Sequence, residues 1–97
     1  MEYLIEKEIV SRLVQAMNKH GSDVQVQMKG CSVITNLASH QTPMKASVMM
    51  AGGGGGAVVL CMVMHSKDPQ LQEKGLQALR NLSANCEDNK EELARLY

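Results

Sequence analysis

The stretch Asp68–Ala84, which reads DPQLQEKGLQALRNLSA, decides the fold of this chain. Its first two residues are a helix-start signal, because aspartate caps the free amide groups of a first turn and proline fits the first helical position. The small and apolar residues behind them recur at the spacing of one helix face: Leu71, Gly75, Ala78, Leu79 and Leu82. The stretch therefore predicts an amphipathic helix.

The chain contains this helix twice. A shift of 45 residues places Asp23–Ala38 on Asp68–Ser83. Ten of the 25 positions in Val14–Ala38 are identical to their equivalents, including the capping aspartate, a lysine–glycine pair and an asparagine–leucine pair. A period of about 40 to 47 residues with helices inside it is typical of HEAT and armadillo solenoids. The sequence thus predicts a helical repeat protein.

The composition limits the class of protein. A chain of 97 residues forms at most one small domain, and its ten basic and ten acidic side chains give a formal net charge of zero. No overall positive field attracts nucleic acid or an anionic membrane. Phenylalanine and tryptophan are absent and there are eight methionines, which predicts an aliphatic core and no stacking platform for bases.

The cysteines and the apolar segments indicate a reducing compartment. Cys31, Cys61 and Cys86 are an odd number without a CxxC pair, which argues against a disulfide framework or a zinc site. Cys31 and Cys61 are interpreted as buried, inert thiols. The charged N-terminus lacks the core of a signal peptide, and Ala57–Met64 is too short to span a bilayer. We expect a soluble cytoplasmic or nuclear protein with no membrane partner, metal or cofactor.

Capping and breaking residues divide the chain into predicted helices. They cover Tyr3–Lys19 in one or two pieces, Asp23 to about Ser39, Met44–Ala51, Ala57–His65, Asp68–Ala84 and Asn89–Leu96. The helix Ala57–His65 is apolar almost all round, so we expect it to be buried. Gly52–Gly56 lacks the lysine and hydroxyl residue that follow the glycines of a phosphate loop, and predicts a loose, mobile corner instead.

Three segments resemble the armadillo family. They are NKEEL at Asn89–Leu93, the glycine corner before AVVLCM at Ala57–Met62, and DPQLQEKGLQALRNLS at Asp68–Ser83. The resemblance implies an all-α, right-handed α-solenoid of three-helix repeats, truncated at both ends, in a single domain over residues 1–97. Repeat 1 covers about residues 3–40, repeat 2 about 43–85 and a partial repeat 3 about 88–97.

In armadillo proteins the long third helices line a concave groove that binds extended peptides, and an asparagine there bonds the peptide backbone. By motif position Asn36 and Asn81 match that asparagine. The same helix faces carry Lys29 and Ser32 in the first copy and Lys74 and Gln77 in the second, with Arg80 as a secondary candidate.

The chain departs from family members that bind basic peptides. Those members carry tryptophan four residues before the asparagine, where this chain has Ser32 and Gln77. We therefore expect a protein or extended peptide that is acidic or neutral, bound by a non-catalytic scaffold. An alternative is that Asn36 and Asn81 only tie adjacent repeats together.

Two other functions stay open. One is a HEAT-like nucleic-acid or phosphate reader that uses Lys29, Lys45, Lys74 and Arg80. The other is an architectural spacer within a larger protein. No serine, histidine and aspartate set, and no cysteine and histidine set, has the signature of an enzyme.

His20 and His65 are repeat equivalents at helix ends, where we expect them to bond the last carbonyl groups rather than a metal. Two repeats are fewer than the roughly three that a stable solenoid needs. We therefore expect the chain to belong to a longer array, and its exposed solenoid ends to self-associate.

Overall fold

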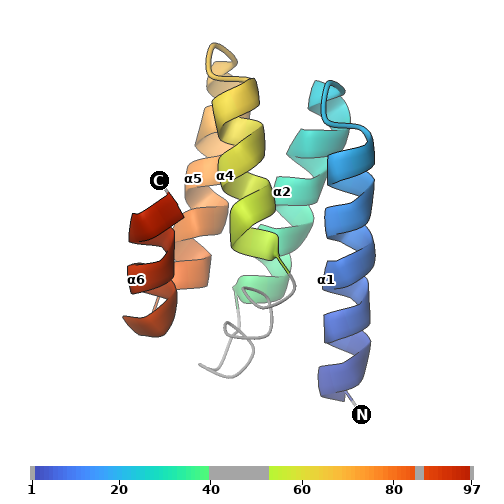
Figure 1. Cartoon of the computed structure of the whole chain (residues 1–97), viewed down its shortest axis with the longest axis vertical. Helices are drawn as coiled ribbons and strands as arrows, with labels where there is room; N and C mark the ends of the chain where they lie inside the picture. The colour runs from blue at the N-terminus through green and yellow to red at the C-terminus, as the bar shows by residue number, and fades with distance from the viewer. Residues whose placement is uncertain (1, 40–52, 85–86, 97) are drawn as a thin grey trace.

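A computed structural model describes residues 2–39, 53–84 and 87–96. This part of the chain folds into helices α1 (Glu2–Lys19), α2 (Val24–Ala38), α4 (Gly54–Met64), α5 (Pro69–Ser83) and α6 (Glu87–Leu96), as Figure 1 shows. The all-α prediction is confirmed for these residues. The predicted helix Met44–Ala51 lies outside them. No helix in the described ranges combines the length and the apolar character that crossing a bilayer requires.

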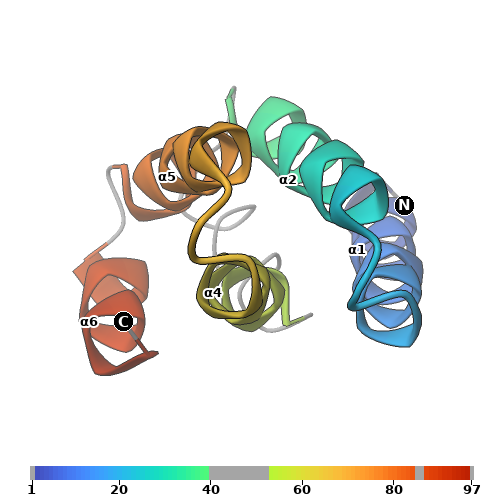
Figure 2. The ribbon, with the colours of Figure 1, turned by 90° about the horizontal axis from the view of Figure 1, so that it is seen from above.

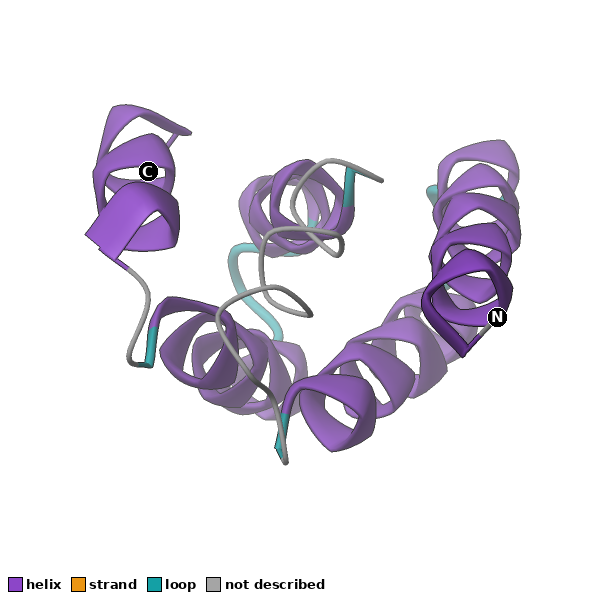
Figure 3. Ribbon diagram, turned by 90° about the horizontal axis from the view of Figure 1, so that it is seen from below, coloured by secondary structure: helices purple, strands orange, loops and turns teal. Residues whose placement is uncertain are grey.

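The helices form two layers. In Figure 2, α2 and α5 lie side by side in one layer, and their mutual contact is the most extensive between helices of the described residues. Short turns return the chain from α1 to α2 and from α4 to α5, so each pair is antiparallel (Figure 1). Seen from below in Figure 3, α4 lies between α1 and α6.

The two long helices begin where the capping signals predict. The Asp68 side chain accepts a hydrogen bond from the backbone N–H of Leu71 at 3.0 Å, and Pro69 occupies the first turn of α5. The Asp23 side chain accepts the N–H groups of Gln25 and Val26 at 3.0 and 3.2 Å. Each aspartate thus satisfies amide groups that a first turn leaves without partners in the helix.

Two details of α4 differ from the prediction. The helix begins at Gly54 rather than Ala57, after Gly53 turns the chain with a φ of 90°. Gly54 and Gly55 are buried, so packing has recruited these glycines into the first turn. The helix is also not buried all round, because its neighbours cover one side only. The other side exposes Leu60, Val63 and Met64 by 49, 65 and 53%.

The remaining boundaries differ by a residue or two. The first helix is a single piece over Glu2–Lys19. The last begins at Glu87, so Asp88 lies within its first turn rather than before it. In α6 the side chain of Asn89 is buried and donates a hydrogen bond to the carbonyl of Leu82 at 2.7 Å, which holds α6 to the end of α5.

In each antiparallel pair, a methionine near the C-terminal end of the first helix packs against a glycine of the second. Met17 of α1 lies over Gly30 of α2, and Met62 of α4 lies over Gly75 of α5. Both methionines are 2% exposed. A Cβ atom at Gly30 would lie 2.8 Å from Cγ of Met17, and one at Gly75 would lie 2.6 Å from Cγ of Met62. A Cβ atom at either position would therefore displace the methionine that packs over it.

We predict opposite effects for two glycine-to-alanine substitutions. Gly75→Ala should lower the free energy of unfolding by about 1–3 kcal/mol, because the buried Met62 must shift from a packed position. Gly56→Ala should raise it by about 0.5–1 kcal/mol, because alanine favours the helix and no atom lies within 4 Å of the added Cβ. Urea denaturation followed by circular dichroism measures both. Equal effects of the two substitutions would contradict the packing described.

Candidate functional site

The predicted binding residues lie on α2 and α5. The contact between these two helices is called the α2–α5 seam. Asn81 is half-buried at this seam, and its Nδ2 donates a hydrogen bond to the backbone carbonyl of Thr35 at 3.0 Å. Asn81 therefore ties repeat 2 to repeat 1, as the alternative interpretation expects. Asn36, the equivalent residue of α2, is exposed.

A shallow groove of about 450 Å³ lies along the seam. It is lined by residues of α2 and by one lysine of α5: Gln25, Met28, Lys29, Ser32, Val33 and Lys74. Three of the predicted binding residues, Lys29, Ser32 and Lys74, thus meet in one groove. Two lysines line this groove, and Met28 and Val33 give it apolar walls, so its chemistry suits a segment that carries both carboxylate and apolar side chains.

The other predicted residues lie outside this groove. Gln77 and Arg80 are exposed on α5, and Asn36 is exposed on α2. A second hollow, of about 710 Å³, is lined by residues 64–70 alone, which form the turn between α4 and α5. It gathers none of the predicted binding residues.

Two glutamines have a role that sequence reasoning missed. Nε2 of Gln27, which is 2% exposed, donates hydrogen bonds to the carbonyls of Met17 and His20, both at 2.9 Å. Nε2 of Gln72 donates to the carbonyls of Met62 and His65 at 2.8 and 3.0 Å. Each glutamine satisfies carbonyls at the end of the preceding helix. The signal was available, because the two glutamines are identical under the 45-residue shift.

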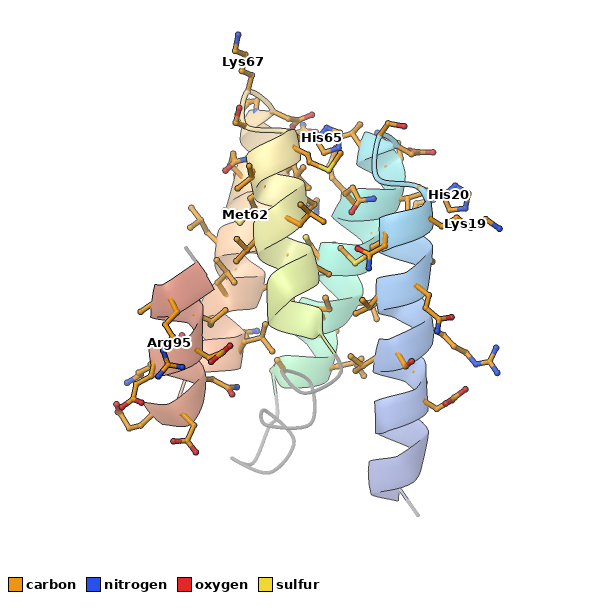
Figure 4. The ribbon with its side chains drawn as sticks, in the orientation of Figure 1. Lys19, His20, Met62, His65, Lys67 and Arg95 are labelled. Carbon is orange, nitrogen blue, oxygen red and sulfur yellow. The ribbon has the colours of Figure 1, made fainter. Side chains whose placement is uncertain are left out.

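The two equivalent histidines have different surroundings. Nε2 of His65 lies 2.8 Å from the carbonyl oxygen of Gly21, which links the turn after α4 to the turn before α2. In Figure 4 His65 points toward that turn, whereas His20 points away from the helices. The expectation that His65 bonds the carbonyls of its own helix is therefore wrong. Among the described residues, no group of three histidine, cysteine or carboxylate side chains is placed to hold a metal ion.

Two buried cysteines meet between α2 and α4. Sγ of Cys31 lies 3.6 Å from Sγ of Cys61, which also donates to the carbonyl of Val58 at 3.1 Å. The hydrogen bond between the thiols raises the pKa of Cys31 and lowers the pKa of Cys61, because the Cys31 thiol can donate to a Cys61 thiolate. Burial was predicted. Their proximity was not, because the two residues occupy different positions in their repeats.

Comparison with models of known protein families, with curated proteins and with solved structures gives no match. The function is therefore inferred from the residues and their geometry.

We predict that the two asparagines contribute unequally to stability. Asn81→Ala should lower the free energy of unfolding by about 1 kcal/mol, because the hydrogen bond to the Thr35 carbonyl is lost. The matched substitution Asn36→Ala should change it by less than about 0.5 kcal/mol, because surface positions contribute little. Urea denaturation in dilute solution compares the two variants. A larger loss for Asn36→Ala would contradict the seam contact.

We also predict that diamide oxidises Cys31 and Cys61 to a disulfide that joins α2 to α4. Each thiol loses its hydrogen, the two sulfurs bond to each other, and the N=N bond of diamide accepts both hydrogens. The reaction has to bring the sulfurs from 3.6 Å to the bonded distance of about 2.0 Å.

A Cys86→Ser variant isolates this pair, and its mass should fall by two hydrogen atoms with no intermolecular product. Cys31→Ser in the same background should remove the reaction. If both thiols remain reduced after diamide treatment of the folded Cys86→Ser protein, the predicted disulfide is wrong.

Proposed function

We propose that this chain is a non-catalytic, armadillo-type interaction scaffold that binds an extended, acidic or neutral segment of a partner protein. The observation that carries the proposal is the groove on the α2–α5 seam, which Lys29 of α2 and Lys74 of α5 both line. An amphipathic helix repeated in tandem, with its two copies side by side in one layer, supports the armadillo resemblance.

The groove offers distinct contacts to such a segment. The ammonium groups of Lys29 and Lys74 would pair with carboxylates, since charge-assisted hydrogen bonds are stronger than neutral ones. Ser32 and Gln25 supply donors and acceptors for the peptide backbone. Met28 offers a flexible apolar surface that adapts to different side chains. A basic segment would meet two like charges and no aromatic wall, so it should be rejected.

The nucleic-acid alternative receives less support. Of its basic residues, Arg80 is exposed outside the groove that Lys29 and Lys74 line, and Lys45 lies outside the described residues. Glu73 precedes Lys74 on the exposed side of α5 and offsets the positive charge there. The net charge of zero also provides no long-range attraction for phosphates.

The test is a selection of peptides from a random displayed library against the full chain. The selected peptides should be enriched in aspartate and glutamate. Lys29→Glu combined with Lys74→Glu should weaken their binding by about tenfold or more, which corresponds to about 1.4 kcal/mol or more. Fluorescence anisotropy of a labelled selected peptide measures the change.

A double variant of equal charge provides the control. Lys67→Glu with Lys90→Glu makes the same change in net charge at exposed positions outside the groove, and should leave peptide binding within about twofold. Equal weakening by both double variants would contradict the groove as the binding site. Basic selected peptides would contradict the proposed partner. Single-stranded RNA that binds with a steep salt dependence would favour the nucleic-acid alternative.

A further inference from the structure

We propose that this chain associates head to tail with a second copy of itself, and that the junction between copies repeats the internal contact between repeat 1 and repeat 2. In this association the exposed face of α5 of one copy packs against the exposed face of α2 of the next. These two exposed faces are the end faces of the chain. A second copy of the same chain binds to each of them. The inference concerns assembly and does not depend on the peptide partner.

The internal contact between the repeats supplies the template. Among the described residues, three polar contacts between repeat 2 and repeat 1 serve as the template, and each joins one residue of repeat 2 to one of repeat 1. They are the hydrogen bond from Asn81 to the Thr35 carbonyl at 3.0 Å, the contact of His65 with the Gly21 carbonyl at 2.8 Å, and the contact of Cys61 with Cys31 at 3.6 Å.

The 45-residue shift converts each internal contact into one between copies. The repeat-1 equivalents of Asn81, His65 and Cys61 are Asn36, His20 and Ala16. The repeat-2 equivalents of Thr35, Gly21 and Cys31 are Arg80, Ser66 and Leu76. All six of these equivalents are exposed in the structure. Each copy therefore presents both halves of the same contact on opposite end faces.

The chemistry of these exposed residues fits the template. Asn36 and His20 keep the side chains of Asn81 and His65, and the groups that they would bond, the carbonyls of Arg80 and Ser66, belong to the backbone. Leu76 is 55% exposed and would lie against Ala16, so an apolar contact replaces the two thiols. The pairing thus buries an exposed leucine and satisfies two polar side chains.

Charge complementarity also favours a second copy. Within the chain, Lys74 of α5 lines the same groove as Met28 of α2. Their equivalents at the junction are Lys29 of one copy and Glu73 of the other, both exposed. At the junction, Glu73 thus takes the position that Met28 has within the chain, and Lys29 takes the position of Lys74. This pair adds an attraction between copies that the internal seam lacks.

The buried faces of the two long helices agree with this arrangement. In α5 the buried residues are Leu71, Gly75, Ala78 and Leu82, whereas in α2 they are Gln27, Met28, Gly30, Cys31, Ile34 and Ala38. Three equivalent positions are therefore buried in one copy of the helix and exposed in the other: Met28 and Glu73, Cys31 and Leu76, and Val33 and Ala78. Val33 is 38% exposed while its equivalent Ala78 is fully buried, and Leu76 is exposed while its equivalent Cys31 is fully buried. Leu76 is one of the six junction residues, and Val33 lines the groove.

A junction of this kind joins two different faces, so it leaves one face unoccupied on each terminal copy. Association should therefore continue with rising concentration rather than stop at a dimer. The groove would also continue across the junction, because Lys29 of the added copy takes the position that Lys74 has at the internal seam.

Two single substitutions, one for each end face, test the proposal. Leu76→Glu blocks the α5 face, and Ala16→Glu blocks the face that includes α1 and α2. Sedimentation velocity should show concentration-dependent oligomers for the unmodified chain and monomers for either variant alone. An equimolar mixture of the two variants should form dimers and nothing larger, because one variant keeps each intact face.

Val63→Glu is the matched control, since it places a carboxylate at an exposed apolar position outside the six junction residues. It should associate like the unmodified chain, and circular dichroism should show all three variants folded. An unmodified chain that stays monomeric at every concentration overturns the proposal. So does association that Leu76→Glu and Ala16→Glu leave intact, or a mixture that forms no dimer.

A cysteine pair tests the register of the junction. In a Cys86→Ser background, Ala16→Cys and Leu76→Cys together place thiols at the equivalents of Cys61 and Cys31. Diamide should then produce a ladder of disulfide-linked oligomers on a non-reducing gel. Either single variant should give no ladder, because the opposite thiol is missing. A folded double variant without a ladder, in a sample that associates, overturns the register.

Discussion

The close approach of each antiparallel helix pair depends on a glycine that lies under a methionine. Gly30 accepts Met17, and Gly75 accepts Met62, at equivalent positions of the two repeats. The short distance that this contact allows brings the amides of Gln27 and Gln72 to carbonyls at the ends of the preceding helices. The packing of an apolar side chain thus sets the geometry of a buried polar contact, which would be unsatisfied at a larger separation.

The α2–α5 seam uses the same kind of polar contact as these pairs. Its hydrogen bond joins a side chain to a backbone carbonyl, and a half-buried lysine lies at its edge. Polar contacts of this kind fix the register of two helices while leaving the surface beside them accessible to solvent. The groove at this seam combines polar residues of both helices with the apolar side chains of Met28 and Val33.

Local signals predicted most of the fold, and contacts between repeats account for most of what they missed. Asp23 and Asp68 cap the helices that periodicity indicated, because both signals act within one turn. The start of α4 was predicted wrongly, because five identical glycines leave the boundary to tertiary packing at Gly54 and Gly55. Apolar periodicity could not show that one side of α4 stays exposed. The groove was predicted in part, since Lys29, Ser32 and Lys74 line it.

Identical residues differ in role according to their place in the array. Asn81 has a helix beside it and donates to the Thr35 carbonyl, whereas Asn36 occupies the same helix position and is exposed. An amide side chain carries two donors and one acceptor, so it suits the backbone of a neighbouring helix and the backbone of an extended peptide equally well. In the proposed assembly, Asn36 would donate to the Arg80 carbonyl of a second copy as Asn81 donates to the Thr35 carbonyl within the chain. Which backbone the amide contacts is decided by whichever neighbour is present.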